Sequence, residues 1–181
     1  TAYWGEPGVV IQIWQFILAL IIGCAVLLLS TFQSPLLPRS PFLLSLSIYL
    51  VAAVLWLSVP LETLANSFYA PISAPTNIPL PYSDAGFYDY LSQSLLIGTD
   101  YFGGIPPRPL YVTFLAFLHL LFDQDYPAII AAQTLVLAVF PVALYFLAEK
   151  LHSPAAGVTV ALFAIFREYT GLWIASNTRV A

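Results

Sequence analysis

Long apolar segments without charge limit what this chain can fold into. Residues 9–32 contain no charged side chain, and as a helix that rises about 1.5 Å per residue they would cross the roughly 30 Å hydrocarbon core of a bilayer. Residues 42–59 and 128–148 are also free of charge, and residues 154–173 carry only the adjacent pair Arg167 and Glu168. The sequence therefore predicts an all-α, polytopic membrane protein with four transmembrane helices.

Composition agrees with a bilayer as the solvent. Charged residues make up 8% of the chain, whereas soluble domains carry roughly 25%, so lipid has to cover much of the surface. The net charge of -4 disfavours nucleic acid as a partner, because nucleic acid needs a basic face. The single cysteine, Cys24, excludes an internal disulfide and is interpreted as a packing residue. Methionine is absent, even at position 1, which favours a fragment of a longer chain.

A long polar connection, residues 61–109, separates the second and third apolar segments. Within it, residues 84–97 predict a helix: Tyr88, Leu91 and Leu95 share one face, and Asp89 and Gln93 share another. Many tyrosines and leucines with few charges are typical of a helix that lies at the membrane interface.

Length and charge predict the same topology. Residues 110–122 are apolar but would form a helix only about 20 Å long, too short to cross. If Arg39 and Lys150 mark the cytoplasmic side, the acidic loop lies outside and only residues 128–148 return the chain inward. Pro141 should kink that helix. We therefore expect a multi-pass protein of the plasma or inner membrane with its large acidic loop on the outer side.

The loop holds the residues that suit chemistry best. Asp84 begins the expected helix, where a carboxylate could bind a divalent cation such as Mg²⁺ or Mn²⁺, or accept a proton from a hydroxyl. Arg108 could grip a phosphate with its planar fork of donors. Simpler interpretations are favoured on residue type alone: Asp84 as a helix cap, Asp89 as a solvated polar residue, and Arg108 as a contact to lipid headgroups.

The two histidines and the charged pair in the last apolar segment are further candidates for functional residues. His119 and His152 are interpreted as hydrogen-bonded packing or interface residues rather than ligands of a porphyrin-like pigment. Arg167 and Glu168 are interpreted as a local ion pair or a headgroup contact, although charges close to the bilayer are costly enough to note.

The order of motifs resembles that of a known enzyme family. The motifs are Ser83-Asp-Ala-Gly-Phe-Tyr88, Gly98, Arg108-Pro-Leu-Tyr111, Glu149-Lys-Leu151 and Ala175-Ser-Asn-Thr-Arg179. Together they are similar to the N-terminal part of GT-C glycosyltransferases, in the protein O-mannosyltransferase and aminoarabinose-transferase group. Residues 42–181 would form this module, with a span at 42–60, an outer loop with interfacial helices at 61–125, and spans at 126–148 and 154–173. Residues 1–41 would be an additional N-terminal helix and turn.

The resemblance implies transfer of a sugar from a polyprenyl-phosphate carrier to an acceptor at the outer membrane face. Asp84 would then be the base or metal-associated carboxylate, and Arg108 a contact to the lipid phosphate. Beside what the resemblance implies, Asp89 is a second catalytic candidate, and Tyr88 or Tyr111 is a candidate for binding substrate. The chain departs from the family pattern at Ala85, where many relatives carry a second acid. A further carboxylate would be expected just beyond Ala181.

Two other function classes stay open. A non-catalytic membrane subunit with the same scaffold is favoured by Ala85, and other membrane subunits would be its partners. A transporter should line its path with charges inside the spans, and this chain has almost none there, so a transporter ranks third.

Overall fold

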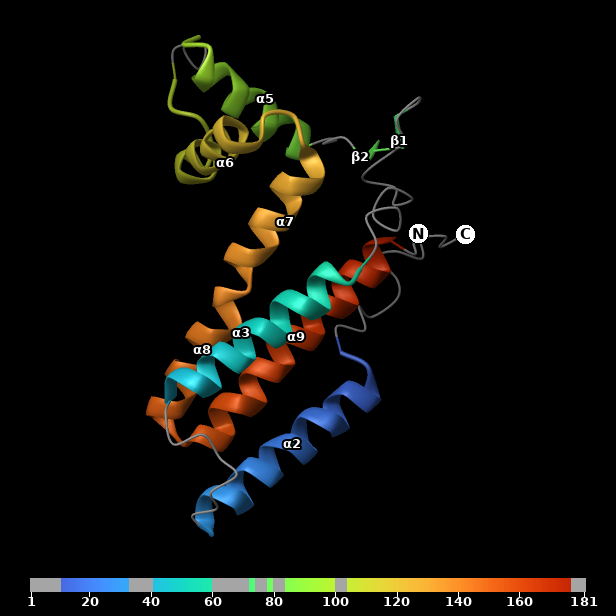
Figure 1. Cartoon of the computed structure of the whole chain (residues 1–181), viewed down its shortest axis with the longest axis vertical. Helices are drawn as coiled ribbons and strands as arrows, with labels where there is room; N and C mark the ends of the chain where they lie inside the picture. Colours follow the sequence, from blue (N-terminus) through green and yellow to red (C-terminus); the bar gives the residue numbers. More distant parts are fainter. Residues whose placement is uncertain are drawn as a thin grey trace. The chain divides into compact units, whose positions relative to one another are not determined.

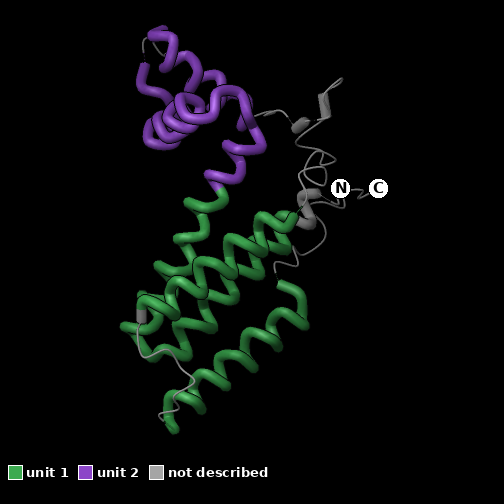
Figure 2. The backbone as a smooth tube through the Cα atoms, viewed as in Figure 1, with its two compact units in different colours: residues 1–59, 134–174, 180–181 green, residues 60–133, 175–179 purple. Residues whose placement is uncertain are grey.

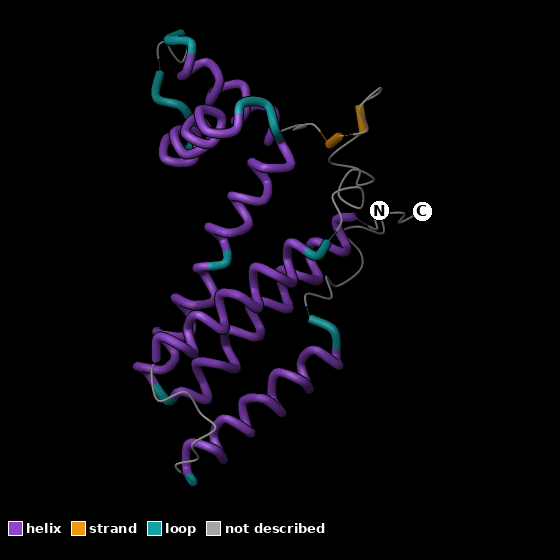
Figure 3. The backbone as a smooth tube through the Cα atoms, viewed as in Figure 1, coloured by secondary structure: helices purple, strands orange, loops and turns teal. Residues whose placement is uncertain are grey.

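The computed structural model describes residues 11–32, 41–59, 72–73, 78–79, 84–99 and 104–176. These ranges are helical apart from turns, connections and one antiparallel pair of two-residue strands, β1 (Ile72–Ser73) and β2 (Ile78–Pro79) (Figure 3). The predicted all-α class is thereby confirmed. The helices are α2 (Ile13–Thr31), α3 (Pro41–Leu57), α5 (Asp84–Leu96), α6 (Pro109–Phe122), α7 (Tyr126–Leu137), α8 (Val139–Leu151) and α9 (Pro154–Ser176).

Three helical stretches are long and apolar enough to cross a membrane: Ile13–Thr31, Tyr126–Leu151 and Pro154–Leu172. Three of the four predicted membrane segments are therefore present as helices of sufficient length. The remaining one, α3, has 17 residues and extends about 25 Å as a straight helix, so a fourth span stays a prediction.

The chain divides into two compact units (Figure 2). Unit 1 comprises Thr1–Val59, Thr134–Ile174 and Val180–Ala181, and unit 2 comprises Pro60–Gln133 and Ala175–Arg179. The helices of unit 1 are thus α2, α3, α8 and most of α9, whereas α5, α6 and the first turns of α7 belong to unit 2.

Small side chains hold the helices of unit 1 close together. In Figure 1, α3, α8 and α9 run side by side, and their shared core contains Ala52, Ala155 and Ala161. Gly157 lies against Tyr145, so closely that a Cβ on the glycine would come within 2.8 Å of the tyrosine ring. Close approach through small residues is how helices associate in lipid, where no hydrophobic driving force acts between them.

Polar side chains inside unit 1 are paired. The buried Gln15 of α2 accepts hydrogen bonds at Oε1 from the Gln12 backbone N–H (2.8 Å) and from the hydroxyl of Thr170 in α9 (2.9 Å). The indole N–H of the buried Trp56 in α3 donates to the carbonyl of Ile165 (3.0 Å). These bonds remove the cost of burying polar groups in an apolar surrounding, and they connect α2 and α3 to α9.

A break between two helices lies just before Pro141, where the sequence predicts a kink. The residue between α7 and α8 is Ala138, three positions before the proline. A proline within a helix has no N–H to donate, and its ring clashes with the carbonyl four residues earlier, here that of Leu137. The Ala138 N–H still bonds to the Thr134 carbonyl (2.9 Å), and the helical bond that is missing is the one that Pro141 cannot donate to the Leu137 carbonyl.

Unit 2 is built around the contact of α5 with α6. Its apolar core contains Leu115, Leu118 and Ile129, with Tyr88 and Tyr126 packed against it. The predicted helices at 84–97 and 110–122 are both present, as α5 and α6. After α5, Gly98 takes a φ of 72°, and the Gly98 and Thr99 N–H groups bond back to Leu95 and Ser94. This is the Schellman ending that a glycine permits, and it turns the chain sharply after the helix.

Candidate functional site

The start of α6 brings together three residues that the sequence singled out. Arg108 is the N-cap of α6 and adopts a left-handed backbone conformation, with φ 55° and ψ 58°, directly before Pro109 at the first helical position. The centre of its guanidinium lies 5.2 Å from the centre of the Tyr88 ring, and that ring meets Tyr111 edge-on at 5.6 Å between centroids. We call Arg108, Tyr88 and Tyr111 the arginine–tyrosine cluster.

Stacking leaves the arginine available to a ligand. Arg108 is exposed, and no carboxylate of the described residues lies within ion-pair distance of it. A guanidinium that stacks through its face still presents its N–H edge, which fits two oxygens of a phosphate or carboxylate. The N-terminus of α6 adds the positive end of a helix dipole at the same place. The cluster can therefore bind an anion.

Tyr111 is held in its neutral form. Its pKa is raised above the ordinary value of 10.0, mainly because burial disfavours the phenolate, and the Asp89 carboxylate raises it further. A hydrogen bond with Gln133 and the positive charge of Arg108 act in the opposite direction, and Tyr88 contributes a small rise. A neutral phenol is a hydrogen-bond donor, so Tyr111 adds a polar group to the cluster.

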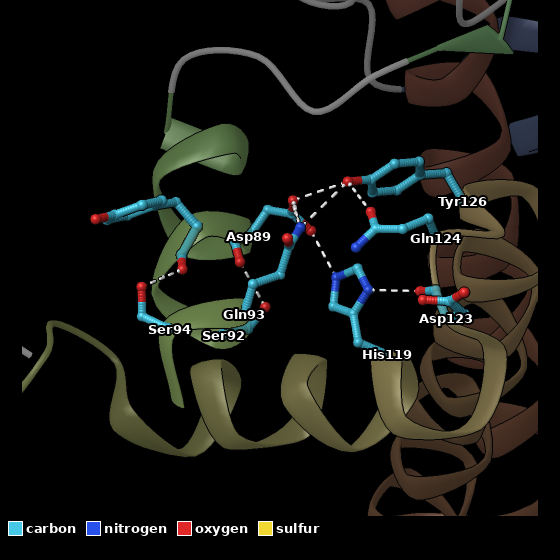
Figure 4. A network of polar contacts seen from close by, with 9 residues as sticks. Asp89, Ser92, Gln93, Ser94, His119, Asp123, Gln124 and Tyr126 are labelled. Atoms are coloured by element: carbon cyan, nitrogen blue, oxygen red, sulfur yellow. Dashed lines mark hydrogen bonds and ion pairs between the residues drawn. The ribbon is translucent and has the colours of Figure 1, made fainter. Parts of the chain in front are cut away.

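Asp89 lies in a buried polar network between α5 and α6 (Figure 4). It is 9% exposed, so the interpretation of Asp89 as a solvated residue on the polar face is wrong. Its Oδ1 is 2.7 Å from His119 Nε2, and its Oδ2 accepts from the Gln93 amide at 2.8 Å and from the Tyr126 hydroxyl at 2.9 Å. Both oxygens of the carboxylate are therefore engaged by neighbours within unit 2. We call Asp89, Gln93, His119 and Tyr126 the Asp89 network.

The hydrogen-bond partners of His119 fix the position of one of its protons. Its Nδ1 is 2.7 Å from the backbone carbonyl of Asp123, and a carbonyl can only accept, so Nδ1 carries a proton. Nε2 and Asp89 Oδ1 are 2.7 Å apart, so a second proton lies between them, on either the ring or the carboxyl. His119 is 5% exposed and uses both nitrogens. The interpretation of this histidine as a hydrogen-bonded packing residue is confirmed.

Asp84 is the first residue of α5 and is exposed. It precedes Tyr88 by one helical turn, so the two side chains share a face of α5. The three residues before Asp84, which include the alternative cap Ser83, lie outside the described residues. Within the described part of the chain, no three His, Cys, Asp or Glu side chains form a group that could hold a metal ion, so the divalent cation at Asp84 stays a prediction.

Sequence reasoning found some of these contacts and missed others. Asp89 and Gln93 were predicted to share a face of the helix, and this is confirmed by the hydrogen bond between them. His119 and Tyr126 as partners of Asp89 were missed, because they lie 30 and 37 residues further along the chain. The only available signal was that an aspartate on a largely apolar helix has to be paired if the helix packs on another. His152 is exposed in the turn after α8 and contacts the Ser153 hydroxyl at 3.0 Å.

Comparisons with known protein families, with curated proteins and with solved structures found no match for this chain. A function can therefore be inferred only from the chemistry of the residues described above.

Proposed function

We propose that this chain is part of a membrane glycosyltransferase that takes a sugar from a polyprenyl-phosphate carrier. The arginine–tyrosine cluster is the observation that supports the proposal. The exposed guanidinium of Arg108 lies over the Tyr88 ring, and that ring contacts the neutral Tyr111 at the start of α6. The sequence resemblance implies that Arg108 contacts the lipid phosphate, and Tyr88 and Tyr111 were separate candidates for substrate binding.

The cluster suits the leaving group of such a reaction. When the bond between the anomeric carbon and the phosphate oxygen breaks, negative charge grows on the phosphate. Arg108 would hold two phosphate oxygens, Tyr111 would donate a hydrogen bond to one of them, and the N-terminus of α6 would favour the same charge. Interactions that strengthen as charge develops are the ones that accelerate a reaction.

Asp84 is the candidate for the other half of the reaction. The acceptor hydroxyl would attack the anomeric carbon and give up its proton to the Asp84 carboxylate, while polyprenyl phosphate leaves with the electron pair of the broken bond. In a metal-dependent variant, Asp84 would instead bind Mg²⁺ or Mn²⁺. Asp89 would act as a positioning residue, because the network occupies its carboxylate and fixes α5, and thereby Tyr88, against α6.

The exposed apolar face of α6 supports the proposal that unit 2 lies at the membrane surface. One face of this helix is buried, with Val112, Leu115 and His119, whereas Leu110, Phe117 and Leu120 on the other face are 87%, 54% and 71% exposed. The helix ends four residues before Tyr126, where a stretch long enough to cross a membrane begins. A short amphipathic helix so close to a span would lie along the interface with its apolar face in lipid, as the lipid-linked donor requires.

Transfer assays on the full-length protein test the proposal. The reconstituted protein would be given radiolabelled polyprenyl-phosphate sugars and a membrane extract as acceptor, and compared with Asp84→Asn and Arg108→Gln. Asp123→Asn is the matched control, because it removes the charge of another exposed acid in unit 2. Loss of transfer in the first two variants, with transfer kept in the control and all proteins folded, is the expected result.

A non-catalytic membrane subunit is the second candidate, and one observation favours it. The buried Asp89 is fully occupied by hydrogen bonds, which leaves Asp84 as the single exposed carboxylate of α5. Absence of transfer from any carrier, or equal transfer by wild type and Asp84→Asn, would put this candidate first.

A further inference from the structure

A groove lies in unit 1 and has a volume of about 330 Å³. Its walls are largely apolar and come from several helices, with Phe140 and Leu144 on α8 and Val160 and Phe163 on α9. The two charged residues in its lining are Arg167 and Glu168. We call it the α8–α9 groove.

The charged residues stand at one end of the α9 wall. Val160, Ala164 and Arg167 are spaced by four and three residues, so they share one face of α9. From Val160 to Arg167 this face runs about 10 Å along the helix axis. The groove is therefore apolar along most of its length and carries its charge at one end.

Both main walls belong to helices that can cross a membrane, Tyr126–Leu151 and Pro154–Leu172. If these helices cross the membrane, lipid chains rather than water surround a groove with such apolar walls. Hydrocarbon fills it at no desolvation cost, whereas a polar solute would leave its own hydrogen-bonding groups unsatisfied.

Arg167 needs a polar partner at this position. An arginine within a membrane-crossing helix is costly unless it reaches the headgroup level or pairs with an opposite charge. Its Nη1 is 3.8 Å from the nearest Glu168 carboxylate oxygen, longer than a hydrogen bond, and its side chain is 64% exposed. The guanidinium is thus largely exposed, and a phosphate oxygen can accept from its donors.

We propose that the α8–α9 groove binds an anionic phospholipid of the surrounding bilayer. One acyl chain lies along Phe140, Leu144 and Val160, and the phosphate accepts hydrogen bonds from Arg167. Glu168 beside the arginine limits the total negative charge that the site tolerates, so a phosphodiester with a single charge fits better than a phosphomonoester. The site is in unit 1 and does not depend on the proposed glycosyl transfer.

Native mass spectrometry of the full chain, released from detergent micelles, measures this binding. The probes are dioleoyl phosphatidylglycerol and dioleoyl phosphatidylcholine, which have the same chains but differ in net charge. Arg167→Gln removes the phosphate contact, and Val160→Trp fills the groove. Lys150→Gln and Val54→Trp are the matched controls, because they make equivalent changes at exposed positions of α8 and α3 outside the groove lining.

We expect phosphatidylglycerol to bind more tightly than phosphatidylcholine. Both groove variants should weaken the apparent affinity for phosphatidylglycerol about tenfold, because each removes either one charge-assisted contact or the space for one acyl chain. The controls should change it less than about twofold. Where a groove variant fails to fold, Arg167→Lys, which keeps the charge but not the fork, and Ala164→Leu, which narrows the groove, take its place with the same expected direction.

Several results would overturn the proposal. An equal effect of Lys150→Gln would show general attraction to surface charge, and unchanged binding in the groove-filling variant would place the chain elsewhere. Competition by inorganic phosphate alone would show that no acyl chain is needed. Stronger binding of a polyprenyl phosphate than of phosphatidylglycerol would replace the phospholipid by the carrier as the occupant.

Discussion

Truncating Asp89 tests how unit 2 is held together. Asp89→Ala leaves His119, Gln93 and Tyr126 without the oxygens that they now contact at 2.7, 2.8 and 2.9 Å. Asp89 is only 9% exposed, so little water is available to replace these oxygens. Each buried polar group that loses its hydrogen-bond partner costs roughly 1–3 kcal/mol, so the loss of all three contacts should cost about 3 kcal/mol or more. We therefore expect Asp89→Ala to weaken the packing of α5 on α6 by about that amount.

Asp89→Asn separates the loss of charge from the loss of hydrogen bonds. Its amide N–H can donate to His119 Nε2, while its carbonyl oxygen accepts from Gln93 and Tyr126 and His119 Nδ1 keeps its bond to Asp123. Every hydrogen bond of the network then survives with a neutral imidazole. We expect a cost below about 1 kcal/mol, although the aspartate has been neutralised.

Hydrogen exchange, measured by mass spectrometry on peptides of α5 and α6, reports the local stability of the packing between the two helices. At tenfold per 1.4 kcal/mol, Asp89→Ala should accelerate exchange roughly a hundredfold or more, and Asp89→Asn less than about tenfold. Asp84→Ala, an exposed position on the same helix, is the control. Unchanged exchange in Asp89→Ala, or equal damage by Ala and Asn, would refute the reasoning.

Three further predictions concern single contacts. Gly157→Ala should lower the melting temperature by roughly 2–10 °C, because the new Cβ would lie 2.8 Å from the Tyr145 ring, whereas Gly171→Ala on the same helix meets nothing within 4 Å and should be neutral or slightly stabilising. The Gln15→Ala and Thr170→Val variants should couple by roughly 0.6–1.5 kcal/mol in a double-mutant cycle of thermal unfolding, since their hydrogen bond is buried; additive effects would contradict this. Because the pKa of Tyr111 is raised above 10.0 in the folded protein, the unfolded chain loses its proton first, and stability falls as the pH rises past about 10. Tyr111→Phe should reduce this alkaline loss in denaturation curves measured from pH 8 to 11, and an unchanged curve would contradict it.

Local patterns were sufficient to predict most of the helices. The span around Pro141 was recognisable because a long uncharged segment predicts a membrane helix in any sequence. A proline lacks the N–H for a helical hydrogen bond in any helix, which accounts for a break near Ala138. The helix at 84–97 was recognisable from its periodicity, and Gly98 provided its ending. These features depend on residues within one or two turns of each other.

The partners of Asp89 could not be predicted in the same way. His119 approaches it only because α5 packs on α6, and that packing depends on Leu115, Leu118 and Ile129, whose contacts lie far apart in the sequence. Of the arginine–tyrosine cluster, the residues themselves were predicted as substrate contacts, but the stacking of Arg108 on Tyr88 depends on the left-handed backbone of Arg108 before a proline. Arginine has no particular preference for that conformation, so the sequence did not predict the left-handed backbone at Arg108.

The proton held between His119 and Asp89 offers an atomic reporter of unit 2. A hydrogen shared across 2.7 Å and shielded from water should resonate far downfield in a proton NMR spectrum, apart from the signals of ordinary amides. It exists only while α5 and α6 are in contact. Following that single resonance through a titration with detergent, lipid or substrate would show when the two helices separate, without labelling any other part of the protein.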